Sequence, residues 1–143
     1  MSVPKYISPT VVSNVCFLGD TLISTDQGDI AIMNLSSFNT IRGKSILEIT
    51  KTTTLDKELV HFESNSIGNH NATTLSKTHL VYYQGTFQQA SELTALPNVY
   101  YVPYQGELLY NIIMETHDII IANQMICESY RLFIKIETSL KLI

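Results

Sequence analysis

The chain has 143 residues, with 9 Lys and Arg against 13 Asp and Glu, so its formal net charge is −4. Charged residues make up 15% and hydrophobic residues 45%, which excludes an intrinsically disordered chain and predicts one domain with a substantial core. Ile, Val and Thr number 17, 8 and 15, and these β-branched side chains favour an all-β domain.

Several classes of partner are excluded by the same composition. Lys and Arg are scattered through an acidic chain, so we expect no nucleic-acid partner. No run approaches the roughly 18 apolar residues of a membrane span, and the first nine residues have no hydrophobic segment of a secretory signal. The two cysteines are too few for a disulfide framework or a zinc ribbon, and the histidines show no ligand spacing, so we expect no metal.

In chain order, residues 1–15 contain Pro4 and Pro9 and are predicted to form an extended arm. A short strand at 21–25, a hairpin turn at 26–29 and a return strand at 30–35 follow. Further strands are predicted at 45–52, 59–64, 79–83, 100–104, 108–114 and 119–122, with a helical turn at 87–96 and a C-terminal edge strand at 132–137. Many short strands separated by turns predict a β-sandwich or a barrel-like array.

Three segments carry a family resemblance. The stretch CFLGDTLISTDQG, which opens at Cys16, resembles the first block of the Hint family, the self-processing domains of hedgehog proteins and inteins. The stretch LSKTHLV resembles the family's Thr-x-x-His segment, with Ser76 in place of Thr and with His79 as the His. Residues 110–129 resemble the closing strand pair. The resemblance implies a Hint-like horseshoe of short, mostly antiparallel strands over 16–129, between the extended arm 1–15 and a C-terminal edge strand and tail, 130–143.

The resemblance also implies that Cys16, Ser76 and His79 are catalytic positions, either active or relict. Attack of the Cys16 thiol on the preceding peptide bond would turn the Val15–Cys16 link into a thioester, which is uphill unless the amide is strained or protonated. His79 would give a proton to the amide nitrogen, and Ser76 would hydrogen-bond the peptide. No cofactor is required for this chemistry.

Each of these residues also has an ordinary structural interpretation. The alternative for Cys16 is a small buried core residue, for His79 a hydrogen-bonded residue at the start of a strand, and for Ser76 a turn or cap residue. Cys127 is by default a core residue. Because this fold brings its first and last strands together, we expect the Cα atoms of Cys16 and Cys127 to lie within about 7 Å, the range of a disulfide.

The end of the third segment departs from the splicing pattern. Splicing inteins end in His-Asn, where this chain has Glu128 and Ser129, so we do not expect splicing. Only 14 residues follow Ser129, which leaves no module for the sterol used by hedgehog proteins. An ending in a hydrophobic residue, Glu and Ser is also similar to Hint-like domains of large DNA viruses.

Two functions follow from these observations. We expect first a catalytically retired module in the cytoplasm or the virion, which serves as a structural component, for example a minor capsid protein. It would engage other protein chains through both termini by strand pairing. The alternative is a single-turnover autoprotease that cleaves Val15–Cys16 by an N-to-S acyl shift.

Overall fold

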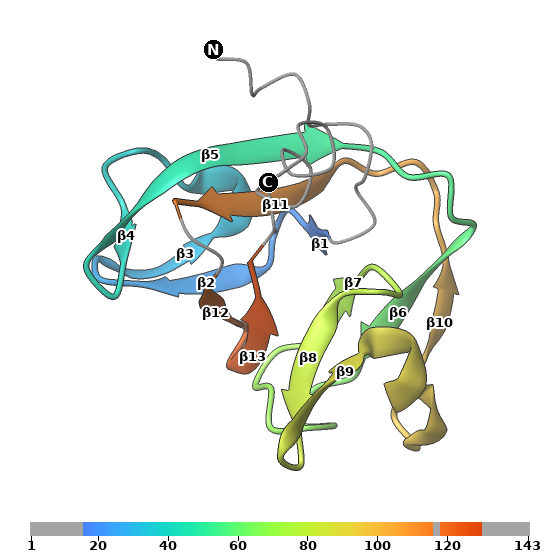
Figure 1. Cartoon of the computed structure of the whole chain (residues 1–143). Helices are drawn as coiled ribbons and strands as arrows, with labels where there is room; N and C mark the ends of the chain where they lie inside the picture. Colours follow the sequence, from blue (N-terminus) through green and yellow to red (C-terminus); the bar gives the residue numbers. More distant parts are fainter. Residues whose placement is uncertain (1–15, 116–117, 130–143) are drawn as a thin grey trace, which may run out of the picture.

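The computed structural model of the chain describes residues 16–115 and 118–129. The described strands form two antiparallel sheets, drawn in Figure 1, which confirms the all-β prediction. The first sheet has the order β10-β6-β7-β1-β11-β5-β4, with β1 Phe17–Leu18, β4 Thr40–Ile41, β5 Lys44–Thr52, β6 Glu58–Phe62, β7 Thr73–Leu75, β10 Val99–Pro103 and β11 Leu109–Met114. The predicted arm, 1–15, and the predicted C-terminal strand, 132–137, lie outside the described residues.

The second sheet brings the two ends of the described chain together. Its order is β3-β2-β12-β13-β8-β9, with β2 Leu22–Thr25, β3 Gly28–Ala31, β8 Leu80–Tyr83, β9 Thr86–Gln89, β12 Ile119–Ala122 and β13 Met125–Glu128. In Figure 1 the long strands β5 and β11 run side by side, and the short β1 lies between them and the half that contains β6, β7 and β10. The residue that precedes β1 therefore lies where the two halves of the first sheet meet.

The main core lies between the sheets and is built from the inward residues of strands from both. Phe17 of β1, Ile112 of β11 and Ile120 of β12 are all fully buried there. The β-branched side chains counted in the sequence supply much of this core, as expected for strands with one buried face. β1 is thus fixed by packing against the second sheet as well as by its ladder partners.

Most predicted strands differ from the observed ones by one or two residues at an end, and two predicted elements differ in kind. The return strand ends at Ala31, and Ile32–Asn34 form a 3-10 helix, η2, instead of its continuation. This segment turns because Ile32 N donates to Thr21 O and Met33 N to Gly19 O, which ties it to the turn before β2.

The predicted helical turn at 87–96 is a strand followed by a 3-10 helix, η3, at Ala90–Ala95. Phe87 belongs to β9, where it pairs with Tyr82. η3 begins where it does because Gln89 and Glu92 form a capping box, with Gln89 N donating to Glu92 Oε1 at 3.2 Å. The short strands β1, β4 and β7 were not predicted from the sequence, because two or three residues are too few to show an alternation.

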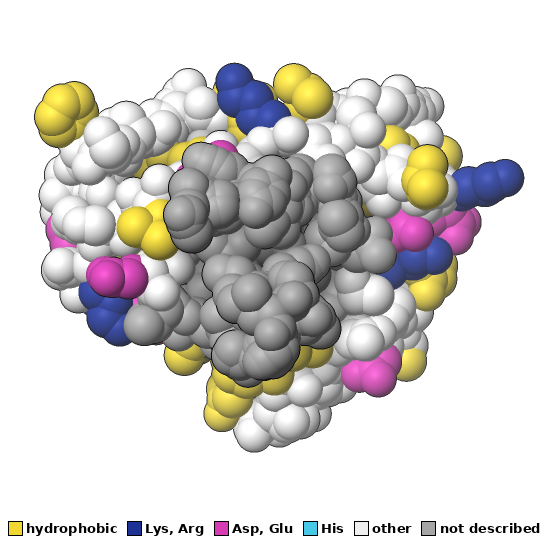
Figure 2. Space-filling view, turned by 45° about the horizontal axis from the view of Figure 1, so that its top comes forward, with side chains coloured by type: hydrophobic (Ala, Val, Ile, Leu, Met, Phe, Trp, Pro, Cys, Tyr) yellow, Lys and Arg dark blue, Asp and Glu magenta, His cyan; other side chains and the backbone are white. Residues whose placement is uncertain are grey.

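Within the described ranges, no helix is long and apolar enough to span a membrane. Figure 2 shows one face of the molecule, on which the described Lys and Arg side chains lie apart from one another. The absence of a nucleic-acid partner stays a prediction.

Candidate functional site at the Val15–Cys16 peptide bond

Cys16 lies between two neighbouring strands, directly before β1. Phe17 pairs with Leu75 on one side and with Tyr110 on the other. Because both ladders are antiparallel, one step back along the chain places Cys16 opposite Ser76 and Asn111. Cys16 is fully buried. The peptide bond on its N-terminal side is therefore presented to residues from both neighbouring segments.

Ser76 bonds to both backbone groups of Cys16. Cys16 N donates to Ser76 Oγ at 2.8 Å, and Ser76 N donates to Cys16 O at 3.0 Å. The carbonyl of Ser76 accepts from His79 N at 3.2 Å, so the hydroxyl occupies the place that a ladder carbonyl would have. The expected bond from Ser76 to this peptide is thus present in the structure, on the nitrogen that an acyl shift would release.

His79 is fully buried beside the same peptide. Its ring packs against the ring of Phe17, with 4.3 Å between the centroids, and its Nε2 lies 2.9 Å from the carbonyl oxygen of Glu128. A carbonyl only accepts, so this bond assigns the proton of the neutral ring to Nε2. Nδ1 is buried and makes no hydrogen bond within the described residues. The amide hydrogen of Cys16 is thus accepted by Ser76 and not by His79.

Burial makes the His79 ring hard to charge. Desolvation lowers its pKa from 6.5 to about 4, with the backbone groups of Glu128 and Cys16 acting in the opposite direction. The ring is therefore neutral at pH 7.

The thiol side of Cys16 has its own small apolar cluster. Cys16 packs there with Leu59 and Leu109, and Tyr104 is half-buried against them. Burial raises the pKa of Tyr104, and its proximity to Cys16 contributes to the shift. The thiol therefore has apolar surroundings on this side.

Asn111 is a site residue that the sequence analysis did not single out. It is 2% exposed and lies opposite Cys16, so its side chain leaves the same face of the sheet as the thiol. The signal in the sequence was a single polar residue inside the apolar run Leu109–Met114. Nothing in that run identifies the partner strand, so its position beside Cys16 was not predictable.

Cys127 does not join this site as a disulfide. Both cysteines are free and buried, and Cys127 packs in the main core whereas Cys16 packs in the smaller cluster. Burial raises the pKa of the Cys127 thiol, which makes it unreactive. The close approach of the two Cα atoms stays a prediction.

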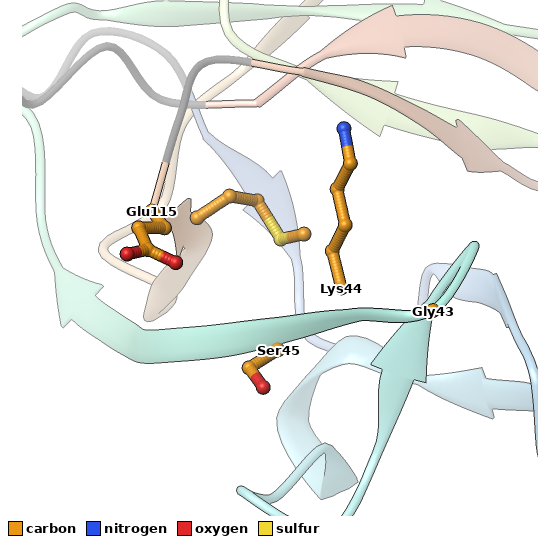
Figure 3. A pocket seen from close by; sticks show the side chains of 5 residues that line it. Gly43, Lys44, Ser45 and Glu115 are labelled. Carbon is orange, nitrogen blue, oxygen red and sulfur yellow. The ribbon is translucent and has the colours of Figure 1, made fainter.

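A surface hollow of about 320 Å³ lies at β5 and β11, away from Cys16, Ser76 and His79. Figure 3 shows Lys44 and Glu115 on its two sides, and Gly43, Ser45 and Met114 complete its lining. No group of three or more His, Cys, Asp and Glu side chains suited to a metal occurs in 16–115 and 118–129.

The fold resembles solved intein-like structures. A bacterial intein-like domain from Clostridium thermocellum superimposes with a TM-score of 0.63 at 18% identity, covering 82% of this chain and 100% of that one. A DnaB intein from Synechocystis sp. PCC 6803 gives a TM-score of 0.56 at 11% identity, covering 80% and 98%. At these identities the likeness shows the fold alone. No curated protein matches the sequence.

The sequence itself supplies the stronger evidence of ancestry. Residues 15–133 match the sequence profile described as the Hint domain, a stretch that begins one residue before Cys16 and includes Ser76 and His79. The match covers most of the chain and extends over both sheets, and it agrees with the three segments recognised by their residues. The chain belongs to the Hint domain family.

Proposed function

We propose that this Hint domain cleaves the peptide bond between Val15 and Cys16 through a thioester and does not splice. The observation that carries the proposal is the hydrogen bond from Cys16 N to Ser76 Oγ, with His79 buried beside the same residue. Two parts of the sequence 60 residues apart, Cys16 and the segment with Ser76 and His79, meet at this residue. If Cys16 only began a strand, its N–H could donate to an ordinary backbone carbonyl of the neighbouring strand and would not need the Ser76 hydroxyl.

The first step is an N-to-S acyl shift. The Cys16 sulfur attacks the carbonyl carbon of Val15, the C–S bond forms and the C–N bond breaks, and the nitrogen of Cys16 leaves as an amine. The thiol proton is transferred to this nitrogen, with Nδ1 of His79 as the carrier because Nε2 is committed to Glu128. Ser76 keeps the nitrogen in place, since its hydroxyl rotates to follow the amine as it forms.

The second step is resolution of the thioester by water or by an added thiol. Water adds to the Val15 carbonyl carbon, the C–S bond breaks, and the products are a Val15 carboxylate and a free Cys16 thiol. Splicing would need a side-chain amide at the end of the third segment, where this chain has Glu128 and Ser129. The downstream segment therefore stays attached to the domain.

Intact-mass spectrometry of the purified full chain tests this proposal. Incubation with dithiothreitol is expected to yield a fragment that begins at Cys16, with no ligated product. Cys16→Ala is expected to stay intact, whereas the matched variant Cys127→Ala changes the other buried thiol and is expected to cleave. An intact wild-type chain after prolonged incubation between pH 5 and pH 8 would contradict the proposal.

A second candidate function is a retired module that serves as a structural component of a protein assembly. The observation in its favour is that burial lowers the pKa of His79 to about 4, which makes the ring a weak base for the thiol proton. An intact wild-type chain would favour this candidate. It is then tested by comparing the incorporation of the full chain and of a chain lacking residues 1–15 into assembled virus particles, with loss of incorporation expected for the shortened chain.

A further inference from the structure

Three charged side chains lie near the end of β13, where the carbonyl of Glu128 bonds to the His79 ring. Arg42 Nη2 lies 2.8 Å from Asp118 Oδ1, and Lys44 Nζ lies 2.9 Å from Asp118 Oδ2, so each carboxylate oxygen has its own cation. Arg42 Nη2 also donates to the carbonyl of Ile119 at 2.5 Å. Asp118 is the least accessible of the three, with 14% of its side chain exposed against 46% for Arg42 and 54% for Lys44. We call these three residues the Asp118 cluster.

The two cations are carried by a rigid hairpin turn. Ile41 pairs with Lys44, so Arg42 and Gly43 are the two central residues of the turn, with φ of 49° and 76°. Gly43 N donates to Asp26 Oδ2 at 2.8 Å, which fixes the turn from the other side. A positive φ is unfavourable for arginine, by about 1 kcal/mol or more, whereas Gly or Asn would tolerate it. The ion pair with Asp118 offsets this conformational cost.

The backbone of Asp118 is joined to the end of β13. Asp118 N donates to Ser129 Oγ at 2.9 Å, and Ser129 N donates to Asp118 O at 2.8 Å. Ser129 is 1% exposed. The preceding residue, Glu128, offers the carbonyl that lies 2.9 Å from His79 Nε2. The Ser129 N–H that bonds to Asp118 and the Glu128 carbonyl that bonds to His79 belong to the same peptide group.

We propose that Asp118, held by Arg42 and Lys44, is a positioning residue that keeps the Glu128 carbonyl on His79 Nε2 and thereby leaves Nδ1 unprotonated, able to accept the thiol proton and pass it on. This inference rests on the proposed cleavage at Cys16. If the strand end moved, Nε2 would lose its acceptor and the neutral ring would be free to place its proton on either nitrogen. The side chain of Asp118 acts through Ser129 and Glu128 and touches none of the reacting atoms.

The cluster suits this role because its central carboxylate stays charged. Burial raises the pKa of Asp118, but the Lys44 ammonium, the Ile119 amide and the Arg42 guanidinium outweigh this effect and keep the pKa below its ordinary value. Two charge-assisted bonds on one carboxylate also restrict its rotation more than one bond would. Asp118 is thus held by two cations, Lys44 and Arg42, which lie 74 and 76 residues earlier in the chain.

The test combines the cleavage rate in dithiothreitol with the imidazole nitrogen signals of His79 in ¹⁵N-labelled protein. Asp118→Asn keeps the shape of the side chain and removes its charge. Asp29→Asn makes the same change on the exposed edge strand β3 of the same sheet and serves as the matched control. For Asp118→Asn we expect a cleavage rate lower by about tenfold or more and His79 signals that move toward a mixture of tautomers. For Asp29→Asn we expect both readouts to match the wild type.

Variants of Lys44 keep the inference testable if Asp118→Asn does not fold. Lys44→Gln removes one cation from the half-exposed side of the cluster and is expected to produce part of the effect, while Lys44→Arg is expected to restore wild-type signals. Unchanged His79 signals in folded Asp118→Asn and Lys44→Gln would overturn the inference. If the wild type does not cleave while the His79 signals move in Asp118→Asn, the positioning role stands and the proposed cleavage fails.

Discussion

The amide hydrogen of Cys16 is donated to the hydroxyl of Ser76, 60 residues further along the chain, at an N···O distance of 2.8 Å. At this point of the β7–β1 pair a side chain accepts the bond that a backbone carbonyl would otherwise accept, because the Ser76 carbonyl is used by His79 N. A carbonyl is fixed by its strand, whereas a hydroxyl rotates. The nitrogen can therefore change from a planar amide to an amine without leaving its partner.

Replacing this hydroxyl tests its contribution directly. In Ser76→Ala the buried amide of Cys16 loses its acceptor, so we expect the free energy of unfolding to fall by about 1–3 kcal/mol. Ser76→Thr keeps a hydroxyl and is expected to retain most of the stability and the cleavage in dithiothreitol. Urea denaturation and intact-mass spectrometry measure the two effects. Equal stability of the alanine and threonine variants would show that the bond does not stabilise the site.

The low pKa of His79 makes stability depend on pH. The pKa is about 4 in the folded chain against an ordinary 6.5, so the unfolded chain binds the proton first as the pH falls. The free energy of unfolding is therefore expected to decrease from about pH 6.5 to pH 4, by up to about 3 kcal/mol, and then to change no further through this residue. Urea denaturation at pH 7, 5.5 and 4 measures the slope.

His79→Gln is the control for this slope. Glutamine does not titrate, so the variant is expected to lose less stability than the wild type between pH 6.5 and pH 4. The carboxylates of Asp26 and Asp118, whose pKa values are lowered, contribute to acid sensitivity in both proteins and cancel in the difference. Parallel pH profiles for the two proteins would contradict a buried neutral His79.

Asn123 connects the turn between β12 and β13 to two other strands. Its Oδ1 accepts from Leu22 N at 2.9 Å, its Nδ2 donates to Thr73 Oγ1 at 2.8 Å, and its φ is 51°. Asn123→Gly keeps the backbone conformation but loses both bonds, so we expect a loss of about 1–3 kcal/mol. Asn123→Ala adds backbone strain and is expected to lose about 1 kcal/mol more. Thermal unfolding ranks the variants, and an alanine variant as stable as the glycine variant would contradict the strain.

Gly19 is required by close packing between β1 and β2. A Cβ at this position would lie 2.8 Å from Tyr110 Cε1 and 3.1 Å from Met33 Sδ. We therefore expect Gly19→Ala to lower the free energy of unfolding by about 1–3 kcal/mol. Adding Tyr110→Leu removes the nearest ring atom, so the double variant is expected to lose less than the sum of the two single variants. Additive losses in urea denaturation would show that the clash is relieved in another way.

The residues of the candidate site were proposed from residue types and their order in the chain. The β-branched composition predicted the all-β class, and the three segments that resemble Hint domains identified Cys16, Ser76 and His79. Strand boundaries were less predictable where long-range bonds decide them, as at Ile32–Asn34, which bonds to the turn before β2. The elements with the clearest apolar pattern, such as Ile119–Ala122, agree with the structure.

The chemical state of the site was decided only by the tertiary structure. Residue identity and spacing are properties of the chain alone, and they named the thiol, the hydroxyl and the imidazole. The acceptor of the Cys16 amide, the proton position on His79 and the neighbourhood of Asn111 depend on which strands pair. The pKa of His79 depends on complete burial and on a carbonyl 49 residues away. Tautomer and pKa are set by the dielectric surroundings and by partners distant in sequence, and these exist only once the two sheets have packed.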